Sequence, residues 1–561
     1  GKTRWTFPLE LLGDQSFKHT LQSSLQQFLS AWSPTGQAGE LLQKWEAVKD
    51  LIQIVTQCEQ QHRRQQQTQQ RRQLLRQLTA LQRLVQQSGL TSAAAQEAGL
   101  RQQLQQLELA AADSRAAARD LVNEIYGDSS TYWFHRQGRP APAPQLIKQL
   151  STAGAAGQVV DLATAAGTAQ AADALADFFA ADTRGLFAAS QTSDAAQQTM
   201  LAAIDKQLSA AEQQQCAGAA MDGSISLDEA YTALLSMQRG KAPGSDGIPY
   251  EVFVALWDQV GRVMVDAFNE CFAISNQGSS GTTPAVLSDR QRLGLIVLIH
   301  KGGNKPAEDP DSYRPITLLN CDVKIVAKVL VQRMGPVLDS VIDQTQTAFV
   351  PDRQIFDNVM CHLEEIDYLA EQQQPGILIF LDFAKAYDRV NRGWLWKCMQ
   401  QMAFPASCIR WVQLLLAGTT AQVTFNRGQL TRVFSIESGC AQGSPLSPLL
   451  YVIAAQPLAA RCRQLQQQGM FLSISLPSGQ PAPCVHQHAD DTSLHTANVQ
   501  GGQVLLQQAV QPFCAASGGE LNLGKSKGIS IGSHPLLTGV EPATQVNFID
   551  TTQGPHRHLG L

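Results

Sequence analysis

The chain has 561 residues, enough for roughly three or four domains of ~150 residues, so a single compact core is not expected. Hydrophobic residues make up 44% of it and charged residues 16%, which is typical of a globular chain with biased stretches. The net charge of -5 excludes a protein that coats nucleic acid by bulk electrostatics, so any contact with nucleic acid must be local.

Cysteine spacing and hydropathy exclude further classes. The 11 cysteines include no CxxC pair, which gives no zinc module or disulfide framework and favours a reducing compartment. No stretch approaches the roughly 18 uninterrupted apolar residues of a membrane span, because the longest candidate, residues 448–460, contains Gln456 and Pro457. We therefore expect no membrane partner.

Residues 58–126 contain almost no Pro or Gly and predict a helical arm. Its apolar residues recur at spacings of four and three, which places one seam along a helix. They are Leu74, Leu78, Leu81 and Val85. The arginines of the arm are Arg63, Arg64, Arg71, Arg72, Arg76 and Arg83. They are suited to lie along RNA, although a solvated helix face is the more frequent reason for such a run.

The following stretch carries linker signals. Breaks are predicted at Ser88-Gly89 and Gly127-Asp128, and the Pro-rich residues 138–144 predict a linker or an exposed turn. Residues 153–215 are dominated by Ala and show only weak helical periodicity. We expect no catalytic chemistry in this region.

The pattern of the sequence changes at about Ile225. The sequence predicts an amphipathic helix with Ser226 at its N-cap and Glu229 three residues later, the spacing of a capping box. The helix leads into GKAPGSDGIP at residues 240–249, a cluster of turn residues. From there to the end, predicted strands and helices alternate.

A buried strand is predicted at residues 377–381, a short apolar run that ends in Asp382. Such a carboxylate is costly to desolvate unless it is paired or binds a cation. A second acidic site is predicted at a hairpin, where residues 485–489 and 492–495 form the strands around Asp490 and Asp491. Because neighbouring strand residues point to opposite faces, we expect Asp490 to be the principal ligand and Asp491 the more peripheral one.

These segments favour phosphoryl chemistry if they are neighbours in one sheet. Three clustered carboxylates repel one another unless divalent cations neutralise them. Oxygen ligands with open positions suit Mg²⁺, and two such ions ~3.5–4 Å apart stabilise the attacking and leaving oxygens of an in-line transfer. The pair Asp490-Asp491 alone is weak support, because most such pairs are surface turns or helix caps.

Several short motifs strengthen this prediction by matching one family in order. From about Ile225 to Leu561, the chain resembles the reverse transcriptase domain of LINE-type (non-LTR) retrotransposon polyproteins. The matching texts are GKAPGSDGIP, LIVLIHKGG, SYRPITLLNCDVKIVAKVL, QTAFVPDRQIFDNV, FLDFAKAYDRV, SGCAQGSPLSPLL, HQHADD, SGGELNLGKSKG and HLGL. Such a series is far more specific than any single motif.

The resemblance implies an α+β fold, with the fingers and palm of a right-hand polymerase, a ferredoxin-like palm sheet and a mostly α-helical N-terminal region. The expected segments are a helical linker or arm at 1–137, an Ala-rich helical linker at 138–224, fingers with the palm start at 225–381, and palm at 382–561. The wording of residues 1–12 resembles the stretch that follows the family's endonuclease. We therefore expect a piece without that endonuclease and without the thumb.

The resemblance also implies a metal site. Asp382 and Asp490 are expected as the chief ligands of two Mg²⁺ ions, for which Mn²⁺ can substitute. Asp491 is expected beside them, with the Phe383 carbonyl as an additional ligand. Tyr387 stands where the family's aromatic residue lies under the sugar and rejects a 2′-hydroxyl by sterics. Its alternative is an ordinary core aromatic.

Three basic residues are matched to the triphosphate. Lys301 and Arg314 resemble the fingers residues that contact it, a task suited to an ammonium point charge and a bidentate guanidinium. Their alternative is an ordinary surface pair. Lys525 resembles the lysine proposed to protonate or neutralise the departing pyrophosphate.

A glycine-containing loop is matched to the template base and the incoming nucleotide. Gly439, Gln442 and Gly443 belong to it, and the glycines allow close approach of the backbone. Its alternative is a Gly-rich helix cap. The chain departs from the commoner family text at Ala441, where Arg is usual, and at His488, where an aromatic residue is usual. We expect His488 to pack beside the site rather than to bind metal.

The resemblance thus implies an RNA-directed DNA polymerase that extends a DNA primer on an RNA template with dNTPs. It also implies a place in nuclear and cytoplasmic ribonucleoprotein, not secretion. A maturase or an RNA-dependent RNA polymerase is a related alternative, which Tyr387 disfavours. A decayed or repurposed remnant that binds RNA without catalysis is the alternative from another class, and the three aspartates count against decay of the palm. The oligomeric state is not defined by the sequence.

Overall fold

The computed structural model describes residues 4–88, 96–107, 147–151, 159–220, 222–275, 286–303, 305–426 and 428–550. The predicted break at Gly127-Asp128, the Pro-rich residues 138–144 and the closing HLGL lie outside the described residues. Within them, contacts define two compact units. The first comprises Leu146–Ala233 and Phe272–Leu561, and the second Arg4–Gln145 and Leu234–Cys271.

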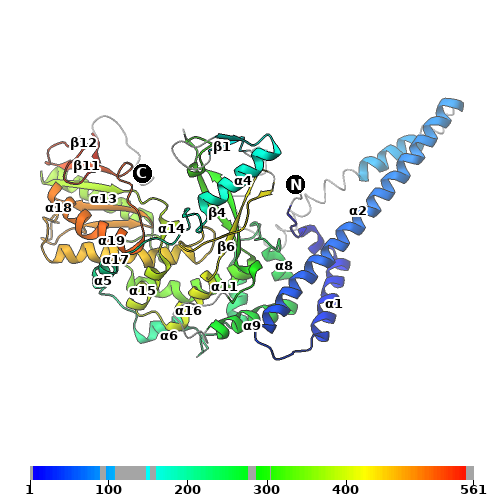
Figure 1. The fold of residues 1–561 in the computed structure, drawn as a ribbon, viewed down its shortest axis with the longest axis horizontal. Coiled ribbons are helices and arrows are strands. Elements are labelled where there is room, and N and C mark those ends of the chain that lie inside the picture. The colour runs from blue at the N-terminus through cyan, green and yellow to red at the C-terminus, as the bar shows by residue number, and fades with distance from the viewer. Residues whose placement is uncertain are drawn as a thin grey trace. The chain divides into compact units, whose positions relative to one another are not determined.

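Helices and strands mix throughout the larger unit, as an α+β fold requires (Figure 1). The main helices of the chain are α1 (Gln15–Ala31), α2 (Glu40–Ser88), α4 (Ala165–Phe179), α5 (Asp194–Leu201), α6 (Ala210–Ala217), α7 (Leu227–Leu235), α8 (Tyr250–Ala255), α9 (Trp257–Ser275), α10 (Asp289–Arg292), α11 (Cys321–Met334), α12 (Leu338–Val341), α13 (Ile355–Glu371), α14 (Ala386–Arg389), α15 (Arg392–Gln401), α16 (Ala406–Leu416), α17 (Ser447–Gln467), α18 (Val499–Leu505) and α19 (Gln511–Ser517). The strands are β1 (Gln149–Ser151), β2 (Val159–Asp161), β3 (Leu293–His300), β4 (Tyr313–Leu318), β5 (Pro375–Leu381), β6 (Thr420–Phe425), β7 (Gln429–Leu430), β8 (Phe434–Ser435), β9 (Val485–His488), β10 (Asp491–Thr496), β11 (Lys527–Gly532), β12 (Gly539–Val540) and β13 (Asn547–Phe548).

The first unit contains a six-stranded sheet in the order β12-β13-β11-β5-β10-β9. Its four long strands pair antiparallel, and in chain order they follow the pattern strand, helix, strand, strand, helix, strand. This is the strand arrangement of a ferredoxin-like split βαβ unit. The apolar run Ile377–Leu381 forms most of β5, as predicted, because a strand covered on both faces excludes polar side chains.

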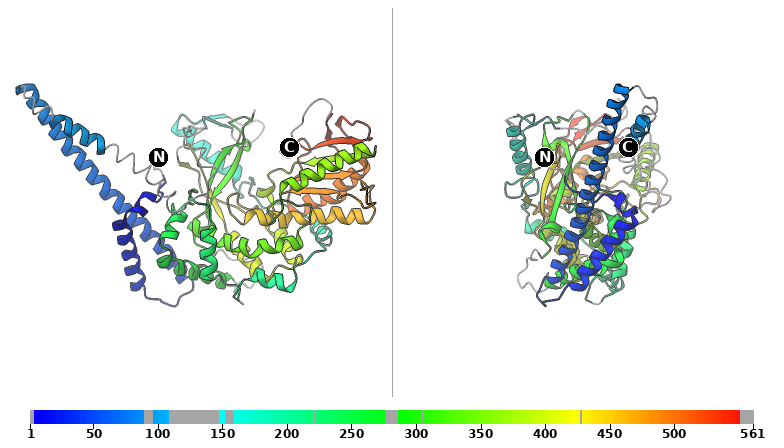
Figure 2. Two further views of the ribbon diagram at one scale, coloured as in Figure 1. Left: turned by 180° about the vertical axis from the view of Figure 1, so that it is seen from behind. Right: turned by 90° about the vertical axis from the view of Figure 1, so that its right-hand side faces the viewer.

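The two faces of this sheet are covered by different helices. Leu369 of α13 packs with Leu378 of β5 and Ile531 of β11 on one face. On the other, Gly502 of α18 comes so close to Ile379 that a β-carbon there would meet the isoleucine side chain at 2.8 Å. Figures 1 and 2 show α13 and α17 on opposite sides of the sheet.

A second sheet, in the order β4-β3-β6-β7 with β8 on β6, has one covered face and one open face. Residues of α4 pack against it in a buried cluster that includes Phe179, Ile296, Tyr313 and Val423. The other face carries Ile299, about half exposed, opposite the exposed Arg314. A polar ligand can therefore reach this sheet from the open side.

The N-terminal predictions fall in the second unit and in the start of the first. Helix α2 is continuous from Glu40 to Ser88, which confirms a helical arm up to the predicted break. One of its arginines, Arg63, forms ion pairs with Asp14 and Glu59. In the first unit the predicted capping box of α7 is confirmed, because Ser226 N donates to Glu229 at 2.9 Å and Glu229 N donates to Ser226 Oγ at 3.1 Å.

The expected boundaries at 137, 224 and 381 remain predictions. The structure groups the described part of residues 147–220 with the two sheets, where α4 covers β6 and α5 packs on α19. The turn cluster 240–249 lies in the second unit, where Phe7 N donates to Gly247 O at 2.9 Å. Among the described residues, no helix is long and apolar enough to cross a membrane.

Candidate active site

The three predicted carboxylates meet at one edge of the six-stranded sheet. Asp382 follows the last residue of β5, and Asp490 lies in the turn between β9 and β10. Thr492 pairs with Leu381 in antiparallel register, so one step further along the strands Asp491 stands opposite Asp382. Two segments more than 100 residues apart in the sequence thus place their carboxylates close together.

The turn that carries the acidic pair is tight. Asp491 still pairs with His488, which leaves Ala489 and Asp490 as the two turn residues. Ala489 adopts a positive φ of 58°, a conformation that costs a non-glycine residue energy and persists only where its surroundings hold it. Here Gln346 Oε1 accepts a hydrogen bond from Ala489 N at 2.9 Å. Gln346 therefore fixes the backbone next to Asp490.

Two of the carboxylates, Asp490 and Asp491, have a raised pKa. Burial, with the nearby charges of Asp491 and Asp382, raises the pKa of Asp490 above its usual value. Burial and Asp382 likewise raise the pKa of Asp491. Asp490 is half-buried, whereas Asp491 is exposed. Such a cluster favours a cation that replaces lost solvation and cancels the repulsion.

A short segment before β11 supports Asp382. Asn522 N donates to the Asp382 carbonyl at 2.8 Å, and Asp382 N donates to Ser526 Oγ at 3.2 Å. Lys525 Nζ lies 3.8 Å from Asp382 Oδ2. The adjoining bridge between Phe383 and Leu521 uses the Asp382 carbonyl and the Ala384 amide. The Phe383 carbonyl therefore lies outside this bridge.

Tyr387 lies beside the acids, on the helical turn that follows Asp382. Its ring stacks on Tyr451, with centroids 4.4 Å apart. Burial, and then the charge of Asp490, raises the pKa of the Tyr387 phenol above its usual value. The ring is thus neutral, held from one side by Tyr451, and near enough to Asp490 to feel its charge.

The loop with Gly439, Gln442 and Gly443 connects the Tyr387 turn to the second sheet. Cys440 N donates to the Tyr387 carbonyl at 2.9 Å, and Thr317 N of β4 donates to the Gln442 carbonyl at 2.6 Å. A β-carbon on Gly443 would meet the Thr317 carbonyl oxygen at 2.2 Å, so only glycine fits there. The loop is therefore fixed between the two sheets.

Asp388 is an important residue that the sequence reasoning missed. It is 3% exposed, and Gln442 Nε2 lies 3.1 and 3.0 Å from its two carboxylate oxygens. Burial raises the pKa of Asp388 to about 7, although the charge of Lys385 and the hydrogen bond from Gln442 oppose the shift. Its position directly after Tyr387 in the motif was the available signal.

Three lysines, Lys301, Lys385 and Lys525, lie near Asp311, which precedes β4. Lys301 Nζ donates to the Asp311 carbonyl at 2.6 Å, and Lys385 Nζ lies 2.7 Å from Asp311 Oδ1. Burial lowers the pKa of Lys301, and the charges of Lys385, Lys305 and Lys525 lower it further. Lys301 and Lys525 are thus close enough to repel each other. Asp311 and Lys385, which hold this group together, were not predicted.

Arg314 is exposed on β4, where it pairs with Ile299 of β3, two residues before Lys301. Among the described residues, its side chain has no hydrogen bond or ion pair. His488 lies as expected beside the site, where its Nδ1 is 3.0 Å from Thr347 Oγ1. Burial lowers the pKa of His488, against the charge of Asp490.

Comparison with known proteins gives a consistent match. Residues 299–558 match the family described as "Reverse transcriptase (RNA-dependent DNA polymerase)". The chain is 30% identical over 317 residues to the "Transposon TX1 uncharacterized 149 kDa protein" of Xenopus laevis, a match that covers 56% of this chain and 22% of that protein.

Two further relatives come from insects. One is the "RNA-directed DNA polymerase from mobile element jockey" of Drosophila melanogaster, 28% identical over 243 residues, or 42% of this chain and 24% of the relative. The other is the Pol polyprotein from the type-1 retrotransposable element R2 of Popillia japonica, 25% identical over 237 residues, or 42% and 31%. The chain thus spans less than a third of each of these three relatives.

Proposed function

Because this chain carries a reverse transcriptase domain of the LINE-type, non-LTR retrotransposon family, we propose that it is the polymerising part of an RNA-directed DNA polymerase. It extends a DNA primer on an RNA template with dNTPs. The observation that carries the proposal is the meeting of Asp382, Asp490 and Asp491 at one sheet edge.

The reaction is a two-metal nucleotidyl transfer. Asp382 and Asp490 would hold two Mg²⁺ ions, for which Mn²⁺ would substitute, and Asp491 and the Phe383 carbonyl would complete the ligand set. Metal held there would supply the lowering of the pKa of the primer 3′-hydroxyl and the charge that stabilises the leaving pyrophosphate. The half-exposed position of the Asp382 side chain, 44% accessible, supports this role, because substrate phosphate and water must share the metal shell.

The six-stranded sheet serves as the palm and the second sheet as part of the fingers. The split βαβ strand order supports the first assignment. The fixed loop at Gln442 and Gly443 supports the second, since it joins β4 to the Tyr387 turn. In this assignment the loop supports the template base and the incoming nucleotide.

The incoming triphosphate binds the lysine group. Lys301 and Lys525 contribute point charges on either side of the metal site, and their mutual repulsion is relieved when a polyanion binds. Arg314 contributes a bidentate contact from the open face of β4 once nucleotide is present. Lys525 then protonates or neutralises the pyrophosphate that departs.

Tyr387 selects the sugar. Its ring cannot withdraw, because it stacks on the buried Tyr451. A 2′-hydroxyl on an incoming rNTP would collide with it, so dNTPs are preferred.

Primer extension on an RNA template with dNTPs and Mg²⁺ tests the proposal, using the chain within its full reading frame. Extension by the wild-type protein that is lost in Asp490→Asn supports it. Extension that persists unchanged in Asp490→Asn removes this residue from catalysis. RNA binding without any extension by the wild-type protein would instead favour a repurposed element that binds RNA only.

A further inference from the structure

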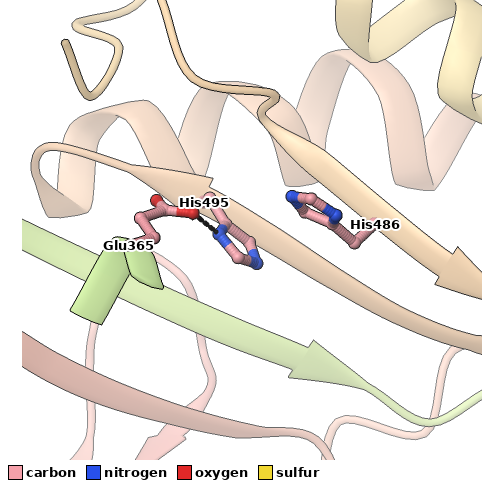
Figure 3. Close-up of side chains that lie close together, drawn as sticks. All are labelled: Glu365, His486 and His495. Carbon is pink, nitrogen blue, oxygen red and sulfur yellow. Dashed lines mark hydrogen bonds and ion pairs between the residues drawn. The ribbon is translucent and has the colours of Figure 1, made fainter. Parts of the chain in front are cut away.

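A buried cluster of ionisable side chains that the polymerase reaction does not use lies between α13 and the six-stranded sheet. It consists of His362 and Glu365 on α13, His486 on β9 and His495 on β10, and each is 6% exposed or less. The three imidazole centroids lie 4.7–4.9 Å from one another. Figure 3 shows Glu365 bonded to His495, with His486 beside them. We call these four residues the histidine cluster.

The hydrogen bonds around the cluster place the proton of two of the neutral imidazoles, His362 and His486, on Nδ1. His495 Nδ1 lies 2.7 Å from Glu365 Oε2, and His362 Nδ1 lies against the Asn358 carbonyl. His486 Nδ1 lies 3.4 Å from Asn358 Oδ1. The orientation of that amide is fixed, because Asn358 Nδ2 donates to the Gln487 carbonyl at 2.8 Å. The Asn358 carbonyl and amide oxygens are acceptors, so the Nε2 atoms of His362 and His486 carry lone pairs, whereas the tautomer of His495 depends on the protonation of Glu365.

These lone pairs have too few donors. Ser493 Oγ lies 2.8 Å from His362 Nε2 and 2.9 Å from His495 Nε2, but one hydroxyl has one proton to donate. The same two Nε2 atoms lie only 3.3 Å apart. Among the described residues, His486 Nε2 and the second carboxylate oxygen of Glu365 have no hydrogen-bond partner at all. Unmet polar atoms at such depth are costly, and each one needs an explanation.

Protonation of a ring does not supply the missing donor. Burial, with the neighbouring imidazoles, lowers the pKa of His362 to about 4 and that of His486 to about 2. Burial alone lowers the pKa of His495 to about 3. At neutral pH the rings are therefore neutral and their lone pairs remain.

We propose that the histidine cluster binds one divalent transition-metal ion of the zinc class. His486 and His495 supply the nitrogen ligands and Glu365 a carboxylate ligand, while His362, whose Nε2 lies 3.3 Å from His495 Nε2, packs beside them. The contributing atoms of Glu365, His486 and His495 already lie within 4.8 Å of one another. Imidazole with carboxylate is a donor set for zinc, cobalt or nickel, and not for Mg²⁺.

The surroundings fit a metal site of this kind. Asn358 accepts from His486 Nδ1 and so fixes the tautomer of that ring from the outer shell, as partners of metal-bound histidines do. A pocket of about 550 Å³ reaches the cluster, and its lining includes Asn358, Cys361 and His486. An ion therefore has a path of entry. Once bound, it would join α13 to the hairpin β9–β10, whose turn carries Asp490.

Metal analysis of the full chain tests this inference independently of polymerase activity. The purified protein is dialysed with excess Mg²⁺, which occupies the carboxylate site, and its zinc is then counted by mass spectrometry. We expect one zinc per chain in the wild type and in His534→Gln, a control outside the cluster. We expect loss of that zinc in His486→Gln and in His495→Gln. A wild-type chain that retains no zinc and takes up none would overturn the inference.

Two measurements need no cluster variant and so do not depend on how the variants fold. Cobalt added to the metal-free wild-type chain is expected to give the strong visible absorption of four-coordinate Co²⁺, which a six-coordinate carboxylate site lacks. Zinc in about 100-fold excess over its Kd is expected to raise the Tm by roughly 2 °C. No visible band together with an unchanged Tm would show that the four side chains form a metal-free hydrogen-bonded network.

Discussion

Strand β10 carries an ionisable group near each end, and the two ends have opposite surroundings. At its start, Asp491 is exposed and faces Asp382 across an open sheet edge. Near its other end, His495 is buried against α13 with three further ionisable groups. An open set of oxygen ligands leaves room for water and substrate, whereas a closed set that includes nitrogen ligands holds an ion for structure. The two proposed sites on this strand thus differ in exposure and in the kind of ligand that they offer.

The largest effect on activity is expected from the exposed carboxylates. Changing Asp382 or Asp490 to Asn removes a metal ligand, so RNA-templated primer extension should fall by about 10³-fold or more, equivalent to ~4 kcal/mol of transition-state stabilisation. Asp194→Asn is a matched control, because its carboxylate is 89% exposed and, within the described part of the chain, forms an ion pair with Lys397. Equal losses in the control and in Asp490→Asn would mean that the effect is not specific to the site.

The buried histidine cluster should make the folding stability of the metal-free chain depend on pH. The three cluster histidines, whose pKa values fall to about 4, 2 and 3, bind protons in the unfolded chain before the folded one. Folding stability should therefore fall as pH drops from about 6.5 toward 4. Glu365 has the opposite effect on folding stability. Burial raises its pKa to about 7, so the folded chain binds this proton at a higher pH than the unfolded chain does.

Three histidines less one glutamate leave a net difference of about two protons between the unfolded and the folded chain. The free energy of unfolding should therefore change by at most ~2.7 kcal/mol per pH unit. Urea unfolding at pH 7 and pH 5 measures it, with His495→Gln expected to flatten the slope and His534→Gln to leave it unchanged. A slope that is the same in all three proteins would separate the histidine cluster from acid stability.

Sugar selection is the next effect in size. Tyr387→Val removes the ring that stacks on Tyr451, so rNTP incorporation relative to dNTP should rise by about 10–100-fold. Tyr387→Phe keeps the ring and should keep the discrimination. Competition assays with both nucleotide types give the ratio, and an unchanged ratio in Tyr387→Val would leave the residue as a core aromatic only.

The smallest effect is expected from Asp388, which positions Gln442 and does not touch substrate. Asp388→Asn weakens the hydrogen bond at Gln442 Nε2, so kcat/KM for dNTP should fall by about tenfold. The pKa of Asp388 is raised to about 7 by burial. Wild-type activity should therefore decline below pH 7 as the carboxylate is protonated, and the variant should lack this step. A variant with the wild-type pH profile would argue against the positioning role.

The sequence predicted those parts of the molecule in which local pattern and tertiary role agree. The apolar run at 377–381 and the hairpin around Asp490 can satisfy their hydrophobic pattern in one way only, and both formed as strands. The capping box at Ser226 is a purely local interaction and was equally predictable. The α+β class, which the family resemblance implied, agrees with the mixture of helices and strands in the structure.

What the sequence could not predict depends on contacts between distant residues. Asp388 reads as a solvated acid in a charged motif, and only the approach of Gln442, 54 positions later, makes it a buried anchor. Likewise His362, His486 and His495 lie on three separate elements, with no ligand spacing that links them. Only packing of α13 on the sheet brings their rings together.

Binding of Mn²⁺ to the carboxylate edge tests the central claim most directly, because it needs neither template nor primer. Electron paramagnetic resonance titration of the wild-type chain, with zinc present to occupy the histidine cluster, should reveal Mn²⁺ bound at Asp382, Asp490 and Asp491. Asp490→Asn should weaken that binding by tenfold or more, while Asp194→Asn should not change it. Identical Mn²⁺ binding by the wild type and Asp490→Asn would contradict the account.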